Sequence, residues 1–266
     1  MGTLASVIYE PTGRAREYAP LACNLYDGCS HGCVYCYAPT ALRKKRATFH
    51  DDPRPRKNII PRLRVDAGRM NCDLRPVLLC FSCDPYQPCE KKYLKTRQAI
   101  HVLYNAGLRA RILTKNGAMA LRDIETFKEC KTEVGISLSF GTDAWRNEWE
   151  PFAGTIEERL NLLRHCLDAG VFTWASVEPV IDPWEALSAI GLLRGRAKII
   201  KVGKINHHAA MEASVNWSKF LGHALQALQG TRYYIKDDLW AFADFALRSR
   251  YAQWTADAHT DRAWQQ

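Results

Sequence analysis

Hydrophobic and polar positions alternate along this 266-residue chain in an order that predicts strands and helices in turn. Short apolar runs bounded by polar residues are typical of strands buried on both faces. Such runs predict six strands, at residues 21–26, 76–82, 109–115, 134–140, 172–180 and 197–205. Segments of helical period predict helices at about 56–70, 91–106, 118–130, 155–169, 184–194 and 215–229. The alternation therefore predicts an α/β fold with a parallel sheet.

Six strand–helix units in succession are typical of an open, doubly wound sheet or of a full or partial (β/α)6 TIM-type barrel. The helix at 155–169 also carries signals at both of its ends. It begins with the capping-box pair Thr155 and Glu158, and Gly170 follows its last turn. These signals support the assignment of helices between the strands.

A single domain without a membrane segment is expected. No linker divides the sequence, so the domain should cover residues 1–266, with a core at about 20–230 and a C-terminal extension at about 231–266. No run approaches the roughly 18 consecutive apolar residues of a membrane span, and the first apolar run is too short for a signal peptide. We therefore expect a cytoplasmic protein with reduced cysteines and no membrane contact.

Polar or unusual clusters stand at the carboxyl end of every predicted strand. In chain order they are CSHGCVYCY, CDPYQP, LTKNG, SLSFG, SVEPVID and KVGKINHH. The carboxyl ends of parallel strands meet at one face of a barrel, and in barrel enzymes that face carries the chemistry. Six clusters in register therefore indicate a single site.

The first of these clusters places Cys29, Cys33 and Cys36 within eight residues and adds no fourth cysteine. A structural zinc site takes four ligands, and iron–sulfur clusters are usually held by four thiolates. The nearest candidates for a fourth ligand, His31 and Cys23, have poor spacing. Three thiolates would leave one iron of a four-iron cluster with an open coordination position. The spacing thus favours a catalytic cluster over a zinc site.

This spacing, with the aromatic Tyr35 before the last cysteine, resembles the signature of the radical S-adenosylmethionine (SAM) superfamily. The resemblance implies a 4Fe-4S cluster on Cys29, Cys33 and Cys36, with SAM bound at the open iron. One electron would then cleave SAM and yield a 5′-deoxyadenosyl radical that abstracts a hydrogen atom. The resemblance also implies a full or partial barrel with the cluster loop after the first strand, and an electron donor such as flavodoxin or ferredoxin.

Further segments resemble the branch of this superfamily that is related to spore photoproduct lyase. They are NLYDGCSHGCVYCY, SCDPYQPCEKKYLKTR, ILTKNGAMALRDIETF, SVEPVID and YYIKD, from about residue 22 to 240. The resemblance implies that Tyr35 packs near the adenine, that Asp84 contacts SAM and that Lys115 meets the methionine carboxylate. It also implies that either Ser137 or Ser139 contacts the ribose or the methionine amine.

Glu178 lies inside the apolar run ASVEPVI, where an unpaired carboxylate would be costly to bury. It is therefore a candidate cofactor-binding residue, or else one half of a structural ion pair with Lys201 or Lys204. Lys115 and Asp84 also have purely structural alternatives. Lys115 could be a surface lysine whose side chain lies along apolar groups, and Asp84 could simply begin a turn.

A cysteine near the DPY segment donates a hydrogen atom to the product radical in the lyase branch, and the resemblance extends that role to this chain. A thiol suits the role because its S–H bond is weak. Cys80, Cys83 and Cys89 lie in this region, and their spacing does not select one of them. Cys83 stands beside the DPY motif, and the alternation of side chains along the predicted strand makes Cys80 face inward. Both are candidate catalytic residues, with plain core thiols as the alternative.

Basic residues are concentrated directly after the cysteine motif. Residues 43–69 hold ten Lys or Arg against three Asp, a surplus of seven out of a net charge of +9. Such a patch suits a polyanion, most often nucleic acid, although a solvated surface is the plain alternative.

The sequence therefore predicts a radical SAM enzyme, of lyase or isomerase type, that abstracts hydrogen from a thymine-type base in DNA or from a modified thymidine nucleotide. Rearrangement or modification of a hypermodified thymine is favoured over repair of thymine dimers. The cysteine motif begins at residue 29, so a domain like the N-terminal domain of the spore enzymes is not expected before it, and a different substrate is expected. A base in a duplex must be extruded, and Trp145, Trp149 and Trp174 are candidates to stack on it. The alternatives are a radical SAM enzyme for a peptide or small molecule, and a non-catalytic iron–sulfur protein that binds DNA.

Overall fold

The computed structural model describes residues 6–70 and 73–251, and its main feature is a parallel sheet of seven strands. The strands are β1 (Leu21–Cys23), β4 (Val77–Leu79), β5 (Ala110–Thr114), β6 (Glu133–Ser137), β7 (Thr173–Val180), β8 (Ile199–Lys204) and β9 (Arg232–Ile235). Their order in the sheet is their order in the chain, and every neighbouring pair is parallel. This order confirms the predicted succession of strand–helix units.

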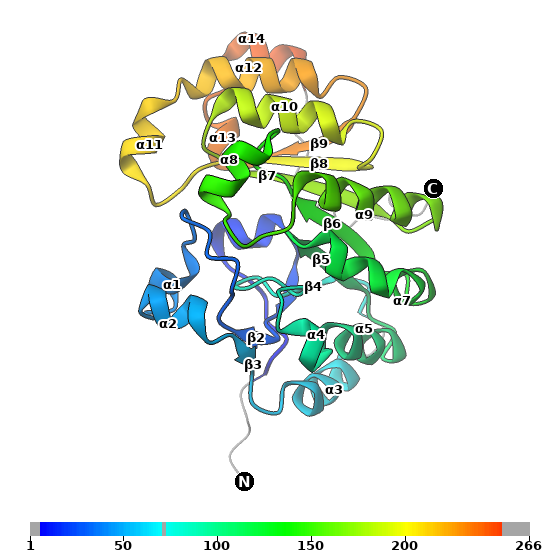
Figure 1. Cartoon of the computed structure of the whole chain (residues 1–266). Coiled ribbons are helices and arrows are strands. Elements are labelled where there is room, and N and C mark those ends of the chain that lie inside the picture. The colour runs from blue at the N-terminus through cyan, green and yellow to red at the C-terminus, as the bar shows by residue number, and fades with distance from the viewer. Residues whose placement is uncertain (1–5, 71–72, 252–266) are drawn as a thin grey trace.

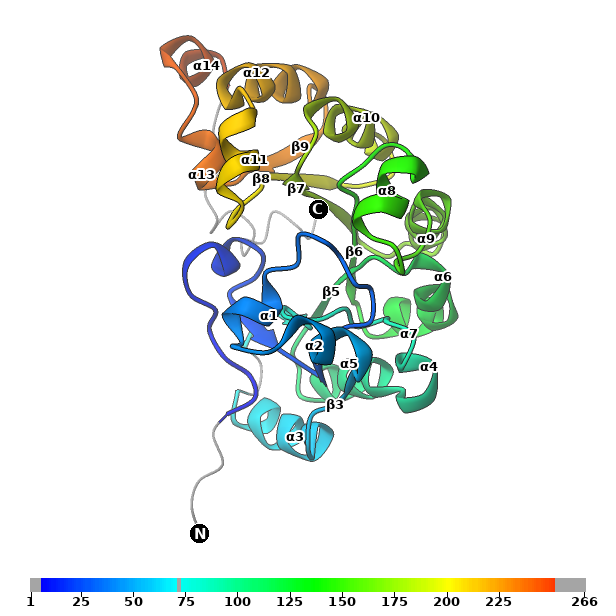
Figure 2. The same ribbon diagram turned by 60° about the vertical axis from the view of Figure 1, so that its left-hand side comes forward.

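Most of the helices lie along the outer side of the curved sheet, which gives the molecule the form of a partial barrel (Figures 1 and 2). The longer ones are α3 (Ile59–Arg69), α5 (Lys95–Asn105), α9 (Ile156–Asp168), α10 (Pro183–Leu193) and α12 (Trp217–Ala227). The shorter ones are α1 (Ala38–Ala41), α2 (Arg46–Asp51), α4 (Glu90–Tyr93), α6 (Gly117–Ala120), α7 (Ile124–Glu129), α8 (Asp143–Trp149), α11 (Ala209–Ser214), α13 (Asp237–Trp240) and α14 (Phe245–Arg250). The predicted capping box is present at the start of α9, between Thr155 and Glu158. No helix among the described residues is long and apolar enough to cross a membrane.

The seventh strand, β9, is absent from the prediction, which placed six strands in a core that ended at about residue 230. Its sequence, RYYI, has only four residues and only the last two are buried, so its pattern is too short to indicate a strand. It nevertheless pairs in parallel with β8 over its whole length. The sheet therefore continues into the segment predicted as a C-terminal extension, of which residues 252–266 lie outside the described part.

The predicted first strand, residues 21–26, is divided in the structure. Its first half forms β1, and Tyr26–Asp27 forms β2, which pairs antiparallel with β3 (Arg54–Pro55) outside the main sheet. The cysteine loop follows β2 and therefore leaves the barrel at the carboxyl end of β1, as the sequence predicts.

The barrel interior below the strand ends is filled by the N-terminal segment around the 3-10 helix η1 (Gly13–Glu17). Lys201 donates from Nζ to the Glu17 carbonyl oxygen at 2.7 Å, and Arg111 donates to that of Tyr18 at 2.6 Å. Trp174 is 2% exposed among these groups, with its ring centre 6.3 Å from that of Tyr18. Trp174 is therefore a core residue and not the base-stacking surface predicted from the sequence.

Candidate active site at the mouth of the barrel

A cavity of about 370 Å³ opens at the carboxyl ends of the strands. Its volume lies in the range of sites that enclose a small-molecule ligand. Ten of the residues predicted from the sequence line it, namely Cys29, Cys33, Tyr35, Cys36, Cys80, Cys83, Asp84, Lys115, Ser137 and Glu178. The structure thus brings together side chains from the cysteine loop and from four strand ends, as the register of the polar clusters predicts.

The cysteine loop, residues 28–37, requires glycine at two positions. Gly28 has a φ of +95°, and a Cβ there would lie 2.6 Å from the carbonyl oxygen of Phe49. Gly32 has a φ of +63°, and a Cβ there would lie 3.0 Å from the ring of Phe152. These left-handed conformations, which glycine adopts without strain, turn the loop so that its three cysteines face the cavity.

Gln87, from the segment after β4, anchors the start of the loop. Its side chain donates to the carbonyl oxygen of Gly28 at 3.1 Å and accepts from the amide of Ser30 at 3.0 Å. At the other end, the amide of Val34 donates to the carbonyl oxygen of Trp149 at 2.9 Å. The protein itself therefore fixes the loop from two sides. Gln87 is a site residue that sequence reasoning missed.

Burial disfavours the thiolate form of the loop cysteines. It raises the pKa of Cys33 to about 12 and raises the pKa of Cys29 well above its ordinary value. Burial also raises the pKa of Cys36, although the nearby charges of Lys115 and Arg46 oppose the shift. The thiols are therefore protonated at neutral pH unless a metal supplies positive charge, because ligation deprotonates a thiol. These properties suit metal ligands better than free nucleophiles.

Within the described residues, no three His, Cys, Asp or Glu side chains are grouped as ligands of one ion. The nine described cysteines are free thiols, and Cys72 lies outside the described residues.

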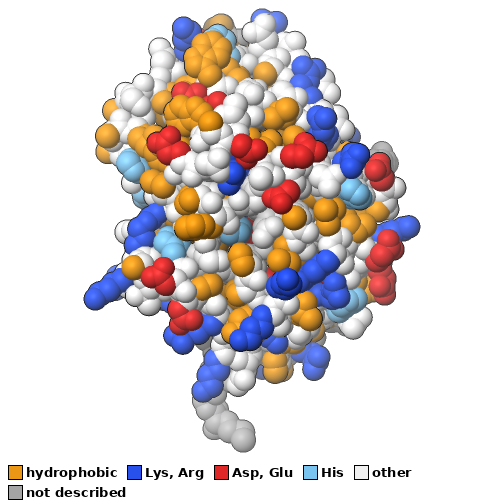
Figure 3. All heavy atoms as spheres, in the orientation of Figure 1, with side chains coloured by type: hydrophobic (Ala, Val, Ile, Leu, Met, Phe, Trp, Pro, Cys, Tyr) orange, Lys and Arg blue, Asp and Glu red, His pale blue; other side chains and the backbone are white. Residues whose placement is uncertain are grey.

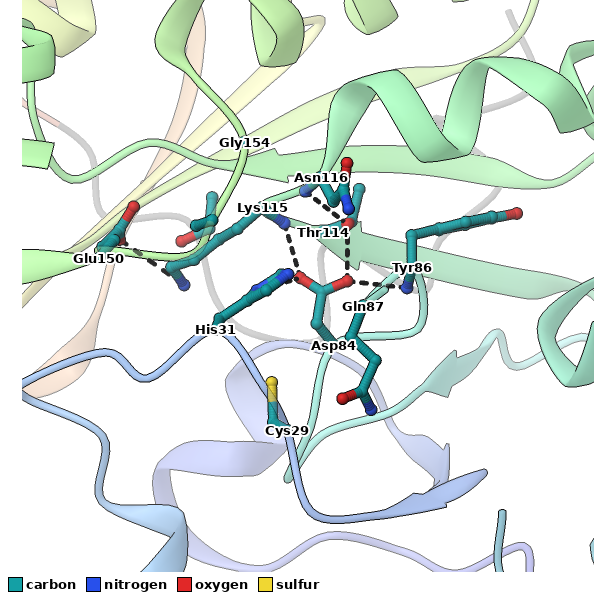
Figure 4. Close-up of polar contacts among 12 residues, drawn as sticks. Cys29, His31, Asp84, Tyr86, Gln87, Thr114, Lys115, Asn116, Glu150 and Gly154 are labelled. Atoms are coloured by element: carbon teal, nitrogen blue, oxygen red, sulfur yellow. Dashed lines mark hydrogen bonds and ion pairs between the residues drawn. The ribbon is translucent and has the colours of Figure 1, made fainter. Parts of the chain in front are cut away.

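Asp84 connects the cysteine loop to the ends of β4 and β5 (Figure 4). Its carboxylate accepts from Thr114 Oγ1 and the Lys115 amide, each at 2.7 Å, and from the Tyr86 amide at 2.8 Å. It also lies 3.5 Å from Nδ1 of His31. Four protein groups thus surround this carboxylate, which holds the mouth of the barrel together.

His31 lies between Cys29 and Cys33 and is only 1% exposed. Burial lowers the pKa of His31, so the ring is neutral at pH 7, with one nitrogen near Asp84. The other nitrogen, Nε2, is buried and has no hydrogen-bond partner in the described part of the chain. An unpartnered buried nitrogen at a cavity wall is expected where a bound group supplies the missing contact.

Lys115 is a half-buried cation at the cavity wall, with 18% of its side chain exposed. Its Nζ lies 3.9 Å from Oε1 of Glu150 and 5.7 Å from the centre of the Tyr35 ring. The Tyr35 hydroxyl donates to the same carboxylate, which also accepts from Arg159 at 2.5 Å. Burial lowers the pKa of Lys115, but Glu150 and other charges outweigh it, so the pKa is raised and the ammonium stays charged. A charged, desolvated ammonium is well suited to bind a carboxylate.

Glu150 and Arg159 are further site residues that sequence reasoning missed. Both are fully buried, and Arg159 also donates to the Ser137 carbonyl oxygen at 2.8 Å. A signal for Arg159 was present, because it stands three residues after Ile156 and four before Leu163, on the apolar face of α9. Nothing in the sequence around Glu150 indicates its partner.

The structure separates the two candidate serines. Ser137 ends β6, lines the cavity and donates from Oγ to the Glu178 carbonyl oxygen at 3.4 Å. Ser139 is fully buried away from the cavity, and its hydroxyl has no partner among the described residues. In a continuous strand, Ser137 and Ser139 would face the same side. Because β6 ends at Ser137, the two side chains do not share a surface.

Glu178 pairs with Lys236, whose Nζ lies 3.0 Å from its carboxylate. The sequence suggested Lys201 or Lys204 as the partner, and that expectation is wrong. Lys201 donates to the N-terminal segment, and Lys204 pairs with a glutamate of α11 at 2.7 Å. Lys236 directly follows β9, the strand that the sequence did not predict, so this partner could not be identified.

Cys80 and Cys83 both line the cavity, and Sγ of Cys83 donates to the Tyr26 carbonyl oxygen at 3.6 Å. A hydrogen bond with Cys80, followed by burial, raises the pKa of Cys83 well above its ordinary value. Cys83 is therefore a neutral thiol with its S–H bond intact at physiological pH. Cys89 does not line the cavity, so two of the three candidate thiols face the site.

Comparison with known proteins identifies the family. The model of the radical SAM superfamily matches residues 23–183, which include all three loop cysteines. The chain belongs to the radical SAM superfamily. An uncharacterised protein of Methanocaldococcus jannaschii is 27% identical over 162 residues, 59% of each chain. An uncharacterised protein of Mycobacterium tuberculosis is 31% identical over 166 residues, 59% of this chain and 48% of the relative. The chain thus spans about half the length of the curated relatives it matches.

Solved radical SAM structures share the fold. Spore photoproduct lyase complexed with dinucleoside spore photoproduct superposes with a TM-score of 0.58 and 18% identity, over 81% of this chain and 62% of that one. SuiB of Streptococcus suis, bound to S-adenosylmethionine, superposes with a TM-score of 0.63 and 8% identity, over 83% and 51%. At these identities the likeness concerns the fold alone, a partial TIM barrel.

As a member of this superfamily, the protein uses a 4Fe-4S cluster and SAM. When bound, these groups together supply the 5′-deoxyadenosyl radical. The site fits them on three observations, which are the loop thiols on one cavity wall, the unpartnered nitrogen of His31 and the charged ammonium of Lys115.

Proposed function

We propose that Cys29, Cys33 and Cys36 hold the cluster and that Lys115 binds the methionine carboxylate of SAM. The observation that supports this assignment is that the four side chains come from two separate segments and line one cavity. Three protein thiolates leave one iron for the amino and carboxylate groups of SAM. Lys115 remains charged while largely removed from water, so its attraction to a carboxylate is weakly screened.

The residues around this centre are proposed to position SAM in complementary ways. Tyr35 presents its ring beside Lys115, and its hydroxyl is occupied by Glu150, so the ring provides a packing surface for the adenine. Ser137 and Glu178 line the same cavity and are proposed to contact the amine or ribose, with the Glu178 carboxylate held in place by Lys236. Asp84 acts indirectly, because its carboxylate is occupied by protein donors and fixes the backbone of Lys115.

We further propose that the substrate is a thymine-type base in DNA, or a modified thymidine nucleotide, which the enzyme rearranges or modifies. Exposed basic side chains follow the cysteine loop, between α1 and α2 and on α3. Figure 3 shows Lys and Arg side chains gathered over the lower half of this face. Phosphate contacts there would bring an extruded base to the neighbouring cavity. The dinucleoside lesion bound by the structurally similar spore photoproduct lyase supports the same substrate class, and favours dimer repair as the second candidate reaction.

Cys83 is proposed to return a hydrogen atom to the substrate radical, with Cys80 as the second candidate. In this step the S–H bond breaks, a C–H bond forms and a thiyl radical remains on the cysteine. The position of both thiols at the cavity wall and the neutral state of Cys83 support the assignment.

Formation of 5′-deoxyadenosine tests the proposed function. The protein is reconstituted anaerobically with dithionite and SAM, and the product is measured by chromatography with and without thymidine-containing DNA. We expect formation that rises several-fold with DNA and is lost in Cys29→Ala, Cys33→Ala and Cys36→Ala. Cys89→Ser, outside the cavity, should retain it.

Digestion of the treated DNA identifies the reaction. An altered thymidine would support modification, and consumption of dimers in irradiated DNA would support repair instead. Formation that is indifferent to DNA would contradict the DNA substrate. No deoxyadenosine from protein with a full cluster would contradict the enzyme itself.

A further inference from the structure

Arg46, the first residue of α2, turns its side chain onto the cysteine loop. Its Nη1 donates to the carbonyl oxygen of Cys36 at 3.0 Å, and its Nη2 donates to that of Val34 at 2.6 Å. Nη2 also donates to the carbonyl oxygen of Cys33. Three carbonyl groups between the second and third loop cysteines therefore converge on one guanidinium.

Arginine is the side chain that suits this arrangement. Its planar guanidinium carries five N–H groups in a fixed fork and serves several acceptors at once, whereas the ammonium of lysine is a compact point charge. The contacts contribute little to global stability, because Val34 is 49% exposed and water can reach this part of the loop. What Arg46 adds is a fixed loop shape and a positive charge beside two of the three loop cysteines.

The charge matters because reduction adds an electron to the cluster. A cation held on the backbone of two ligating residues stabilises the reduced state more than the oxidised one. Cluster potentials respond to nearby charge, hydrogen bonding and solvent exposure. Arg46 stands at the outer side of the loop, whereas Lys115 lies on the cavity side, so the two cations approach the cluster position from different segments.

We propose that Arg46 is a positioning residue that fixes the Cys33–Cys36 turn for cluster binding and raises the reduction potential of the cluster. This inference rests on the proposed ligand role of Cys33 and Cys36. Arg46 is one of the ten basic residues of the 43–69 segment. Because its guanidinium is bound to the cysteine loop, it is not free to bind an external polyanion.

Three variants separate the effects of shape and charge. Arg46→Gln removes the charge, Arg46→Lys keeps the charge but loses the fork, and Lys45→Gln removes an exposed neighbouring charge as a matched control. Iron and sulfide per protein are measured after anaerobic reconstitution, and the potential is measured by a redox titration followed by electron paramagnetic resonance.

We expect Arg46→Gln to shift the potential to a more negative value. At a potential where a minor fraction of wild-type cluster is reduced, that fraction should fall roughly tenfold, which corresponds to about 1.4 kcal/mol. Arg46→Lys should keep most of the wild-type potential but bind less iron. Lys45→Gln should match wild type in both measurements.

Full iron content with a wild-type potential in Arg46→Gln would overturn the proposal. If Arg46→Gln binds little iron while its apo form melts like wild type, the positioning role is supported, and the potential is then measured on the fraction of Arg46→Gln that holds a cluster. A wild-type potential in that fraction would overturn the charge effect. A wild-type cluster that persists in Cys33→Ala or Cys36→Ala would instead show that the ligand assignment has failed, independently of Arg46.

Discussion

At the scale of single residues, Glu150 shows how a buried carboxylate supports the site. Burial raises the pKa of Glu150, but the charges of Arg159 and Lys115 and its hydrogen bonds outweigh burial, so the pKa is lowered from its ordinary 4.5. A lowered folded-state pKa contributes stability that is present above the unfolded-state value and is lost as pH falls through the folded-state value. The carboxylate thus stabilises the apo protein at neutral pH and ceases to do so in acid.

Glu150→Gln should therefore destabilise the apo protein by about 3–5 kcal/mol at pH 7, because Arg159 keeps a fully buried charge and Lys115 a half-buried one without their partner. The difference from wild type should shrink as pH falls below about 4.5. Urea unfolding between pH 3.5 and 7 measures both effects. Glu157→Gln, an exposed position in the first turn of α9, is the matched control and should cost only a few tenths of a kcal/mol. A difference between Glu150→Gln and wild type that does not vary with pH would contradict this assignment.

At the scale of elements, the cysteine loop depends on the conformation of Gly28. An alanine there would place its Cβ 2.6 Å from the Phe49 carbonyl oxygen, at a φ of +95° that side chains rarely adopt. Because that oxygen also accepts from the Cys29 amide at 3.0 Å, any relief of the clash moves the first loop cysteine.

Gly28→Ala should lower the iron bound after reconstitution at least severalfold and reduce the free energy of unfolding by about 1–3 kcal/mol. Gly68→Ala is the control, since Gly68 lies in α3 with no atoms near its would-be Cβ, and alanine there should stabilise the helix by up to about 1 kcal/mol. Iron analysis and chemical unfolding of both variants would decide the matter. A full cluster in Gly28→Ala would show that the loop tolerates another shape.

Local sequence patterns predicted most helices and strands. The hydrophobic periods of strands and helices, and the helix cap at Thr155, depend only on residues that are close together in the sequence. The six apolar runs correspond to strands of the sheet, and the three loop cysteines were recognisable from their spacing alone. The sequence did not predict β9, because its two buried residues are too few to show the hydrophobic pattern of a strand.

Contacts between distant segments were the part of the site that the sequence could not predict. Lys236 reaches Glu178 across 58 positions, and Gln87 reaches Gly28 across 59. The pairing of such residues is determined by which strands lie side by side, so it becomes visible only in the folded barrel. The choice between Ser137 and Ser139 depended in the same way on where β6 ends.

At the scale of the whole molecule, the basic surface and the cavity are brought together by one short stretch of chain. The loop that carries the cysteines runs directly into α1 and α2, and the exposed residues Arg43, Lys44 and Lys45 lie between those helices. A DNA strand bound there would lie beside the mouth of the barrel. Affinity should then be dominated by phosphate contacts, which makes it fall steeply with salt.

Lys45→Gln should weaken binding of double-stranded DNA about equally across sequences and reduce the slope of log K against log salt by roughly 0.9, the value for one lost phosphate contact. Lys128→Gln, exposed on α7 at the opposite side of Figure 1, is the control and should leave the slope unchanged. Fluorescence anisotropy at several salt concentrations measures both variants. Since Lys45→Gln is expected to keep the wild-type cluster potential, a loss of DNA-stimulated deoxyadenosine formation in this variant would arise from substrate binding and not from the cluster. Equal slopes in all three proteins would place the nucleic acid elsewhere and leave the basic surface as a solvated face.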